Sequence, residues 1–541
     1  MANDDVPKYI KKLIESSANG DYKASFQLSK VYSEELSGIP KNLKKAEEYK
    51  RKCASQLEGY KFRLSSIKLV NYKGFDNLTL PLSKGNTTIL VGNNGSGKSS
   101  VLDGIQKTLS HISSRLTTRS YNGDQIDEIE IKNNSNFSTI NPTYQVNNDH
   151  YQFELSQSRS AIELKMKSKY TEINELCNLL RQSNSAISNF SFPLLASYNV
   201  ERANDVTTKD IEDSDEINGV HTWDKSKAYS KSLTGRADFR LFFRWFKEQV
   251  EAENDDNVEF QKLKEAIKFK EKELNSPLIK AILEEAGESD SARLYIQNSQ
   301  EELKILKEKL NNSTNISNKS LEVVKNAIYS FLPGFRGLKL KRNPLDLTLE
   351  KSDITLSVLQ LSQGEKSLLA LVADIARRLV LLNPTASNPL DGTGIVLIDE
   401  IDLHLHPSWQ QKVIIRLEET FPNIQFIVTT HSPQVCHTKK SESIWLLKDG
   451  KKYKAPKGVK GAVSSWVLKN LFLVDERPEN EITELLKRYK ELVYDDKYHC
   501  EEAKVARGQL IDNFGADYDE LVSLDLYIEN REWEKSFEKD S

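Results

Sequence analysis

The stretch Gly92-Asn93-Asn94-Gly95-Ser96-Gly97-Lys98-Ser99 decides the fold of this chain. It fits the pattern G-x-x-x-x-G-K-[ST], in which a glycine-rich loop turns its backbone N–H groups towards phosphate oxygens. The apolar run at 87–91 enters this loop as a buried strand would, and the run at 100–105 leaves it as a helix. A strand, a phosphate-binding loop and a helix in this order predict a nucleotide-binding α/β core.

The residues of the loop have expected parts in holding a nucleotide. The predicted nucleotide-binding residues are Gly92, Asn93, Asn94, Gly95, Ser96, Gly97, Lys98, Ser99 and Ser100. We expect the Lys98 ammonium to reach the β- and γ-phosphates of ATP and the Ser99 hydroxyl to bind Mg²⁺. The helix that opens at Lys98 adds the positive end of its dipole. A glycine turn without a ligand is the alternative, and the flanking strand and helix disfavour it.

A second motif lies far downstream of the loop. The β-branched run at 394–398 ends in the paired acids Asp399 and Glu400. We expect Asp399 to hold Mg²⁺ through its water shell, and Glu400 to orient and polarise the attacking water. Two carboxylates at a strand end are a weak sign alone. Together with the phosphate loop they predict hydrolysis of ATP.

A third motif stands at the start of a long predicted helix. Residues 361–367 read Leu-Ser-Gln-Gly-Glu-Lys-Ser, and the helix continues to about 382. Locally, Ser362 and Glu365 fit a capping box, in which each side chain bonds the other's backbone N–H. This capping role is compatible with contact between the helix start and a phosphate.

A histidine and one more acid complete the set of candidates. His431 follows a predicted strand at 426–430, and Asp402 lies two residues beyond Glu400. The four motifs, in this order, resemble the ABC-type ATPase head shared by SMC, Rad50, RecF and OLD-like ATPases, over about 61–475. The resemblance implies that two heads face each other and sandwich two nucleotides.

The resemblance also implies roles for individual residues. The helix start of one subunit would contact the γ-phosphate held by the other through Ser362, Gln363, Gly364 and Glu365. His431 would sense the γ-phosphate, and Asp402 would lie in the loop where the heads touch. Glu400, Lys98 and His431 are the expected catalytic residues, with ATP and Mg²⁺ as cofactors.

The expected fold class is α/β, an ABC-type head split by a helical insertion and flanked by helical ends. Period changes along the chain predict five parts. They are a Sel1/TPR-like helical hairpin at 1–60, head lobe I at 61–160, a helical insertion or short coiled coil at 161–330, head lobe II at 331–475 and a C-terminal helical segment at 476–541. Because one helical hairpin cannot bury both its faces, we expect it to dock on the head or on a partner.

Composition excludes several classes of protein. The 541 residues carry a net charge of −3, and 38% of them are hydrophobic. No run approaches the roughly 18 apolar residues of a membrane span, and the acidic start lacks a secretory h-region. Four scattered cysteines argue against a disulfide scaffold and for a reducing cytoplasm.

Within the wider class, the chain most resembles the PtuA ATPases of Septu anti-phage systems, including the retron-associated form. That resemblance implies a homodimer or higher homo-oligomer through the heads and an HNH nuclease partner, PtuB. In retron versions it also implies a reverse transcriptase with its RNA-linked DNA. The chain itself shows neither HNH-type histidines nor Toprim acids in strand context, so we predict no intrinsic nuclease and no membrane partner.

Other interpretations stay open. A RecF- or Rad50-like repair ATPase that acts directly on DNA is the main alternative, and a pure interaction module is the second. Six lysines between 448 and 460 surround Asp449-Gly450, a pair that predicts a β-hairpin turn. These lysines, and a second basic cluster at 336–342, could contact nucleic-acid phosphates or form a solvated surface. Gln125 and Gln145 are weak candidates for the glutamine that the family places near the nucleotide.

Overall fold

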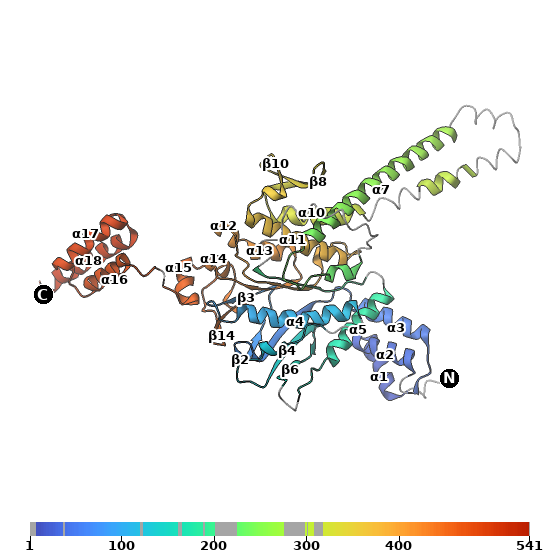
Figure 1. The fold of residues 1–541 in the computed structure, drawn as a ribbon, viewed down its shortest axis with the longest axis horizontal. Coiled ribbons are helices and arrows are strands. Elements are labelled where there is room, and N and C mark those ends of the chain that lie inside the picture. Colours follow the sequence, from blue (N-terminus) through green and yellow to red (C-terminus); the bar gives the residue numbers. More distant parts are fainter. Residues whose placement is uncertain are drawn as a thin grey trace. The chain divides into compact units, whose positions relative to one another are not determined.

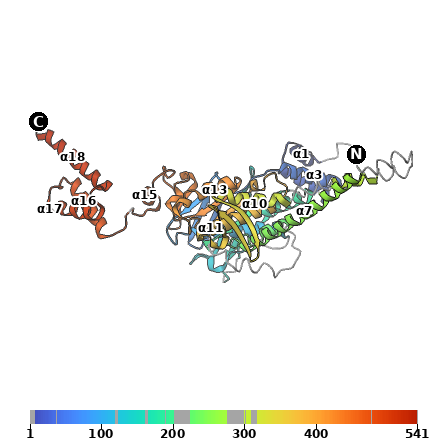
Figure 2. The same ribbon diagram turned by 90° about the horizontal axis from the view of Figure 1, so that it is seen from above.

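The computed structural model forms two compact units, residues 1–462 and 463–541, and each is considered by itself. The structure describes residues 7–35, 38–118, 123–160, 165–187, 190–200, 224–274, 298–299, 301–307, 317–475 and 477–539. Figures 1 and 2 show the elements of both units.

A six-stranded sheet of order β14-β13-β3-β12-β11-β7 forms the centre of the first unit (Figure 1). Its strands are β3 (Thr87–Val91), β7 (Leu194–Tyr198), β11 (Gly394–Ile398), β12 (Ile424–Thr429), β13 (Ile444–Lys448) and β14 (Lys451–Lys454). All are parallel except β14, and every residue of β3, β7, β11 and β12 is buried. Strands covered on both faces carry continuous apolar runs, which explains the lack of alternation in their sequences.

A second, antiparallel sheet has the order β2-β1-β4-β5, with β6 also paired to β4. Its strands are β1 (Phe62–Tyr72), β2 (Phe75–Pro81), β4 (Phe137–Val146), β5 (Asp149–Gln152) and β6 (Leu155–Ser158). The helix α4 (Lys98–Thr117) contacts strands of both sheets. Gly104 permits the close approach, because a Cβ there would lie 3.1 Å from the Leu69 side chain. The predicted α/β core is confirmed.

The N-terminal helices dock on this core. They are α1 (Lys8–Ala18), α2 (Tyr22–Glu34) and α3 (Leu43–Gln56), and α3 packs against α5 (Thr171–Ala186). The Tyr22 and Tyr151 hydroxyls lie 3.1 Å apart, and Lys23 Nζ lies 2.7 Å from Asp149 Oδ1. The helices therefore cover one end of the antiparallel sheet.

Helices interrupt the chain between the two motif-bearing halves of the core. They are α7 (Phe239–Leu274) and α10 (Ser317–Phe331), followed by a small sheet of β8 (Phe335–Arg342), β9 (Leu345–Lys351) and β10 (Ile354–Ser357). Two ion pairs, Lys270–Glu302 and Lys307–Glu271, join α7 to residues 301–307. The long helix α11 (Gln363–Leu382) follows the small sheet, and α10 packs against it.

Short elements fill the loops between the last strands of the first unit. They are α12 (Pro407–Gln410), α13 (Val413–Thr420) and α14 (Pro433–Cys436). The hairpin signal Asp449-Gly450 joins β13 to β14, with φ angles of 50° and 71°. Positive φ at both positions suits a tight hairpin turn.

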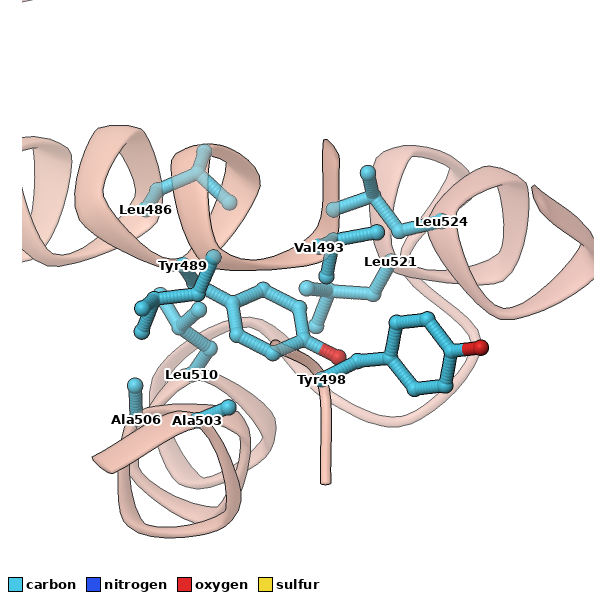
Figure 3. Packing of buried hydrophobic residues seen from close by; sticks show 10 residues of the cluster. Leu486, Tyr489, Val493, Tyr498, Ala503, Ala506, Leu510, Leu521 and Leu524 are labelled. Carbon is cyan, nitrogen blue, oxygen red and sulfur yellow. The ribbon is translucent and has the colours of Figure 1, made fainter. Parts of the chain in front are cut away.

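The second unit is a helical bundle with a core of its own. It contains α15 (Ser464–Val467), a π-helical turn (Leu468–Phe472), α16 (Glu481–Tyr494), α17 (Glu501–Phe514) and α18 (Asp519–Lys539). Figure 3 shows Tyr489, Val493, Leu510 and Leu521 gathered between α16, α17 and α18. Within the described ranges, no helix of either unit combines the length and the apolar character needed to cross a membrane.

Candidate functional site

The glycine loop joins the buried strand β3 to the start of α4. Gly92 and Gly97 have φ angles of +152° and +94°, which a side chain rarely permits. A Cβ at Gly92 would lie 2.3 Å from the Leu447 carbonyl oxygen, and one at Gly97 would lie 2.4 Å from the Phe75 ring. Both glycines are therefore required by close packing as well as by backbone conformation.

Lys98 lies folded into the loop that precedes it. Its side chain is largely buried, and its Nζ donates to the Gly92 carbonyl at 2.8 Å and to the Asn93 carbonyl at 3.1 Å. Burial lowers the pKa of Lys98, and the carboxylates of Asp399, Glu400 and Asp402 oppose that shift. The electrostatic field of three predicted site acids thus acts on the predicted phosphate-binding lysine.

The phosphate loop and the acidic strand end meet in space. Ser99 Oγ donates a hydrogen bond to Asp399 Oδ2 at 2.9 Å, across 300 positions of sequence. Asp399 and Glu400 follow β11, which lies two strands away from β3 in the same parallel sheet. Because parallel strands end at the same edge, the sheet order brings the hydroxyl and the carboxylate together.

Thr429, at the end of β12, organises both acids. Its hydroxyl donates to Asp399 Oδ1 and accepts the Glu400 backbone N–H at 2.7 Å. Glu400 has a φ angle of +47°, which is uncommon for a residue with a side chain. Such a conformation persists only where the surroundings hold it, and the Thr429 hydroxyl is one such restraint.

Asp402 lies in the loop that follows β11, and His431 lies in the loop that follows the adjacent strand β12. The Thr430 hydroxyl donates to Asp402 Oδ1 at 2.5 Å and also accepts the Ser432 backbone N–H at 3.0 Å. His431 lies between Thr430 and Ser432 in sequence and is half-buried. The loop at 399–402 is thus tied to the end of β12 by two neighbouring threonines.

The signature residues lie at the start of α11, apart from the phosphate loop. Ser362 caps the helix and forms the predicted capping box with Glu365. A cavity of about 590 Å³ opens beside them. Its walls are Ser362, Gln363, Gly364, Glu365, Leu368, His404, Leu405, His406, Ser408 and Trp409. Among the described residues, no hydrogen bond joins these signature residues to residues 92–100.

Gly364 fits this cavity wall because it has no side chain. A Cβ there would lie 2.5 Å from the His404 carbonyl oxygen. The turn at 404–406 therefore packs directly on the signature backbone, and His406 caps the short helix α12 with its ring. The two weak glutamine candidates have other contacts: Gln125 accepts from Tyr170, and Gln145 bonds Ser65 and Asn147.

Sequence reasoning missed three residues of this region. Thr429 and Thr430 were read only as part of a strand, although threonine hydroxyls after a buried strand can reach acids on the next strand. Lys351, whose Nζ lies 2.5 Å from Glu365 Oε1, was missed because its strand precedes the signature without any motif of its own. The contacts that these three residues make elsewhere in the same chain became visible only in the fold.

The residues around Ser99 fit a magnesium ion. A hydroxyl and a carboxylate lie within hydrogen-bond distance of each other, and both are hard oxygen donors of the kind that Mg²⁺ prefers. Within the described ranges, no group of three His, Cys, Asp or Glu side chains could hold a metal alone. Mg²⁺ bound by one or two protein groups together with nucleotide phosphates matches this arrangement.

Comparison with known proteins gives one family match and several relatives. The AAA ATPase domain family matches residues 63–436. The chain is 54% identical to the retron Ec83 probable ATPase of Escherichia coli, over 99% of both chains. It is 35% identical to the retron Vc95 probable ATPase of Vibrio cholerae, over 92% of this chain and 96% of that one. A Septu protein PtuA of Bacillus mycoides matches at 49% identity over 73 residues, 14% of this chain and 10% of that one.

Solved structures give weaker likenesses. One is an Smc head domain of Pyrococcus furiosus with an extended coiled coil, bound to the C-terminal domain of ScpA. It is 16% identical, with a TM-score of 0.37, and the match covers 73% of this chain and 96% of that one. An SmcHead bound to the C-winged helix domain of ScpA is 14% identical, with coverage of 72% and 96% and a TM-score of 0.38. The assignment rests instead on the family match and the retron relatives. The chain belongs to the AAA ATPase domain family and, within it, to the retron ATPases related to PtuA.

Proposed function

We propose that this chain is a Mg²⁺-dependent ATPase that hydrolyses ATP between two paired subunits. The observation that carries the proposal is the 2.9 Å hydrogen bond from Ser99 to Asp399. It unites the phosphate loop with the acidic strand end at one edge of the parallel sheet. Lys98 lies beside them, close enough for the acids to affect its pKa.

The chemistry follows from the residues gathered at this edge. Lys98 leaves the Gly92 and Asn93 carbonyls to bind the β- and γ-phosphates, and Ser99 and Asp399 hold the metal. Mg²⁺, when bound, neutralises charge on the β- and γ-phosphate oxygens. Glu400 orients the attacking water and accepts its proton, while Thr429 fixes the backbone of Glu400 and the carboxylate of Asp399.

Pairing of subunits supplies the contacts that one chain lacks. The signature serine lies at an exposed helix start beside its own cavity, with no hydrogen bond to the described loop of the same chain. A second copy can therefore present Ser362 and Gly364 to the γ-phosphate, with Asp402 at the contact and His431 as the sensor. ATP drives pairing to the extent that it binds the paired state more tightly than the open one.

The relatives support a role for this pairing in anti-phage defence. Two of the similar proteins are probable ATPases of retrons, and two are Septu proteins PtuA. We propose that the ATP-driven dimer or higher oligomer controls an associated effector nuclease. That effector is an HNH nuclease of the PtuB kind, joined by a reverse transcriptase with its RNA-linked DNA. Cutting of nucleic acid then belongs to the partner, and this chain supplies the ATP-dependent control.

The test is the substitution Glu400→Gln. It keeps the shape of the side chain but removes the base, so turnover should fall by about 10²- to 10⁴-fold. ATP binding and ATP-dependent pairing, measured by calorimetry and light scattering, should persist. Glu419→Gln, at an exposed helix position, is the matched control and should keep wild-type turnover. Full turnover in Glu400→Gln would remove the assigned role.

The metal requirement has its own test. EDTA should abolish turnover, and added Mg²⁺ should restore it, because Ser99 and Asp399 alone do not replace the charge of the ion. Asp399→Asn should raise the Mg²⁺ concentration needed for half-maximal turnover. Unchanged turnover in EDTA would contradict a metal-dependent mechanism.

Direct action on DNA is a second candidate function, which the β13–β14 hairpin favours. Lys448, Lys451, Lys454, Lys457 and Lys460 are all exposed. If they bind phosphates, duplex DNA should stimulate hydrolysis by the isolated protein, and the affinity should fall steeply with salt. Turnover that does not change when DNA is added would contradict direct action on DNA and would favour control of a partner nuclease.

A further inference from the structure

The signature serine is held by a carboxylate of its own helix. Ser362 Oγ donates to Glu365 Oε2 at 2.9 Å, and the Ser362 backbone N–H donates to the same oxygen at 3.1 Å. The Glu365 N–H reaches back to Ser362 Oγ at 3.4 Å. The hydroxyl that should bind a phosphate therefore points its proton at a charged neighbour.

Lys351 occupies the other oxygen of that carboxylate. Its Nζ lies 2.5 Å from Glu365 Oε1 and 5.2 Å from the centre of the Phe335 ring. Lys351 is the last residue of β9, so it reaches the signature from the small three-stranded sheet. Burial raises the pKa of Glu365, but the hydrogen bonds from Lys351 and Ser362 outweigh this and lower it overall. Glu365 is therefore charged at neutral pH.

A charged carboxylate is an unfavourable neighbour for a triphosphate. Glu365 Oε2 lies 2.9 Å from the hydroxyl that would contact the γ-phosphate, so the two negative groups would come close together. It also competes with the phosphate for the hydroxyl proton. A cation on its far oxygen reduces both effects, because it cancels charge and weakens the carboxylate as an acceptor.

We propose that Lys351 is a positioning residue for the signature serine: it neutralises Glu365 so that Ser362 can turn to the γ-phosphate held by a second copy. This inference rests on the proposed function, in which the signature acts across paired subunits. It assigns a part in ATP hydrolysis to the β8–β10 sheet, whose strand β9 carries Lys351. A movement of that sheet would then change turnover through this one contact.

The first experiment is a double-mutant cycle. Lys351→Met, which keeps length but removes charge, should lower turnover at saturating ATP by about 10- to 100-fold. Adding Glu365→Gln to it should raise turnover clearly above that of Lys351→Met and to within about threefold of Glu365→Gln alone, because the charge that needed cancelling is gone. A double variant as slow as Lys351→Met would overturn the proposal, since a merely structural tether would not be rescued.

Matched variants keep this cycle interpretable. Lys351→Arg keeps the charge and should retain turnover within about threefold of wild type. Lys339→Met removes an exposed lysine from β8 of the same sheet, where it pairs with Glu350 at 3.5 Å, and should behave as wild type. Thermal melting checks that each variant folds. A loss in Lys351→Arg equal to that in Lys351→Met would overturn a role based on charge.

The second experiment tests action across subunits by mixing variants. Lys98→Ala has a defective phosphate loop and an intact signature, and Lys351→Met has the reverse. Lys98→Ala alone should be nearly inactive, and Lys351→Met alone should keep about 1–10% of wild-type turnover. An equal mixture should reach about a quarter of wild-type turnover, through mixed pairs with one intact site. A mixture of Lys98→Ala with Ser362→Ala is the control. If turnover recovers only in the control mixture with Ser362→Ala, the role of Lys351 is overturned. If turnover recovers in neither mixture, the paired site itself is overturned.

Discussion

The phosphate loop and the signature segment are two halves of one candidate site, and the chain builds them differently. Lys98 is 6% exposed and is held by backbone carbonyls of its own loop, while Ser99 reaches Asp399 at the end of β11, two strands away. Ser362 is exposed and is held by one side chain, Glu365. The first half is assembled inside a single chain. The second half exposes the Ser362 hydroxyl at the start of α11. This is the arrangement expected of a surface that completes the site of another copy.

Among the variants that distinguish the phosphate loop from the signature segment, Lys98→Ala has the largest expected effect. Lys98→Ala removes the cation from the loop, so both ATP affinity and turnover should fall by at least about 10²- to 10³-fold. Calorimetry with ATP and a phosphate-release assay measure the two losses. Lys84→Ala, an exposed lysine near β3, is the control. Retained ATP affinity in Lys98→Ala would show that the loop half does not depend on this residue.

Substitutions at two glycines of the phosphate loop test how its backbone conformation and packing contribute to ATP binding. Gly97→Ala adds a clash with the Phe75 ring at 2.4 Å to the strain of a φ of +94°, whereas Gly95 has a φ of +78° and open space around it. Left-handed backbone costs an alanine about 1–2 kcal/mol in either case. ATP affinity should therefore fall by about 100-fold in Gly97→Ala and by about 10-fold in Gly95→Ala. Equal losses would show that strain alone, without the Phe75 contact, sets the effect.

The signature half should respond in turnover and not in binding. Ser362→Ala removes one hydrogen bond to a charged phosphate, about 1.5–3 kcal/mol, so turnover should fall by about 10- to 100-fold. The ATP affinity of dilute, unpaired subunits should stay within about twofold of wild type. Loss of affinity in those unpaired subunits would place the serine in its own chain's site and remove the contrast between the halves.

The smallest expected effect concerns Thr429, whose hydroxyl contacts both Asp399 and the backbone of Glu400. Thr429→Val keeps the shape of the residue but leaves the Glu400 N–H without its acceptor, at a cost of about 1–3 kcal/mol. Turnover should fall by about tenfold, with ATP affinity nearly unchanged. Thr430→Val instead removes the contact with Asp402, so it should affect ATP-dependent pairing more than chemistry. Identical profiles for the two variants would contradict the separate duties of the neighbouring threonines.

Most of the fold could be predicted from local patterns. The run 87–91 and the glycine loop predicted β3 and α4, and Asp449-Gly450 predicted the β13–β14 hairpin, because turn geometry depends on a few neighbouring residues. The threonine contacts and Lys351 could not be predicted in this way. Thr429 and Thr430 contact acids that lie 30 and 28 residues earlier in the chain, and Lys351 of β9 contacts Glu365 of helix α11; no spacing rule predicts these contacts. The five predicted parts of the chain and the roles of the site residues stay predictions.

The sequence by itself determined the chemistry that the chain can offer: a glycine loop with Lys98 and Ser99, the acids Asp399 and Glu400, and a serine-capped helix start. These are local patterns, and local backbone geometry is set by nearby residues. Only the tertiary structure decided which of them meet. The parallel order of β3, β12 and β11 brought Ser99 to Asp399, whereas Ser362 lies at the exposed start of α11 beside Glu365 and Lys351. Contacts across hundreds of residues depend on how strands are ordered in the sheet, and no short motif contains that order.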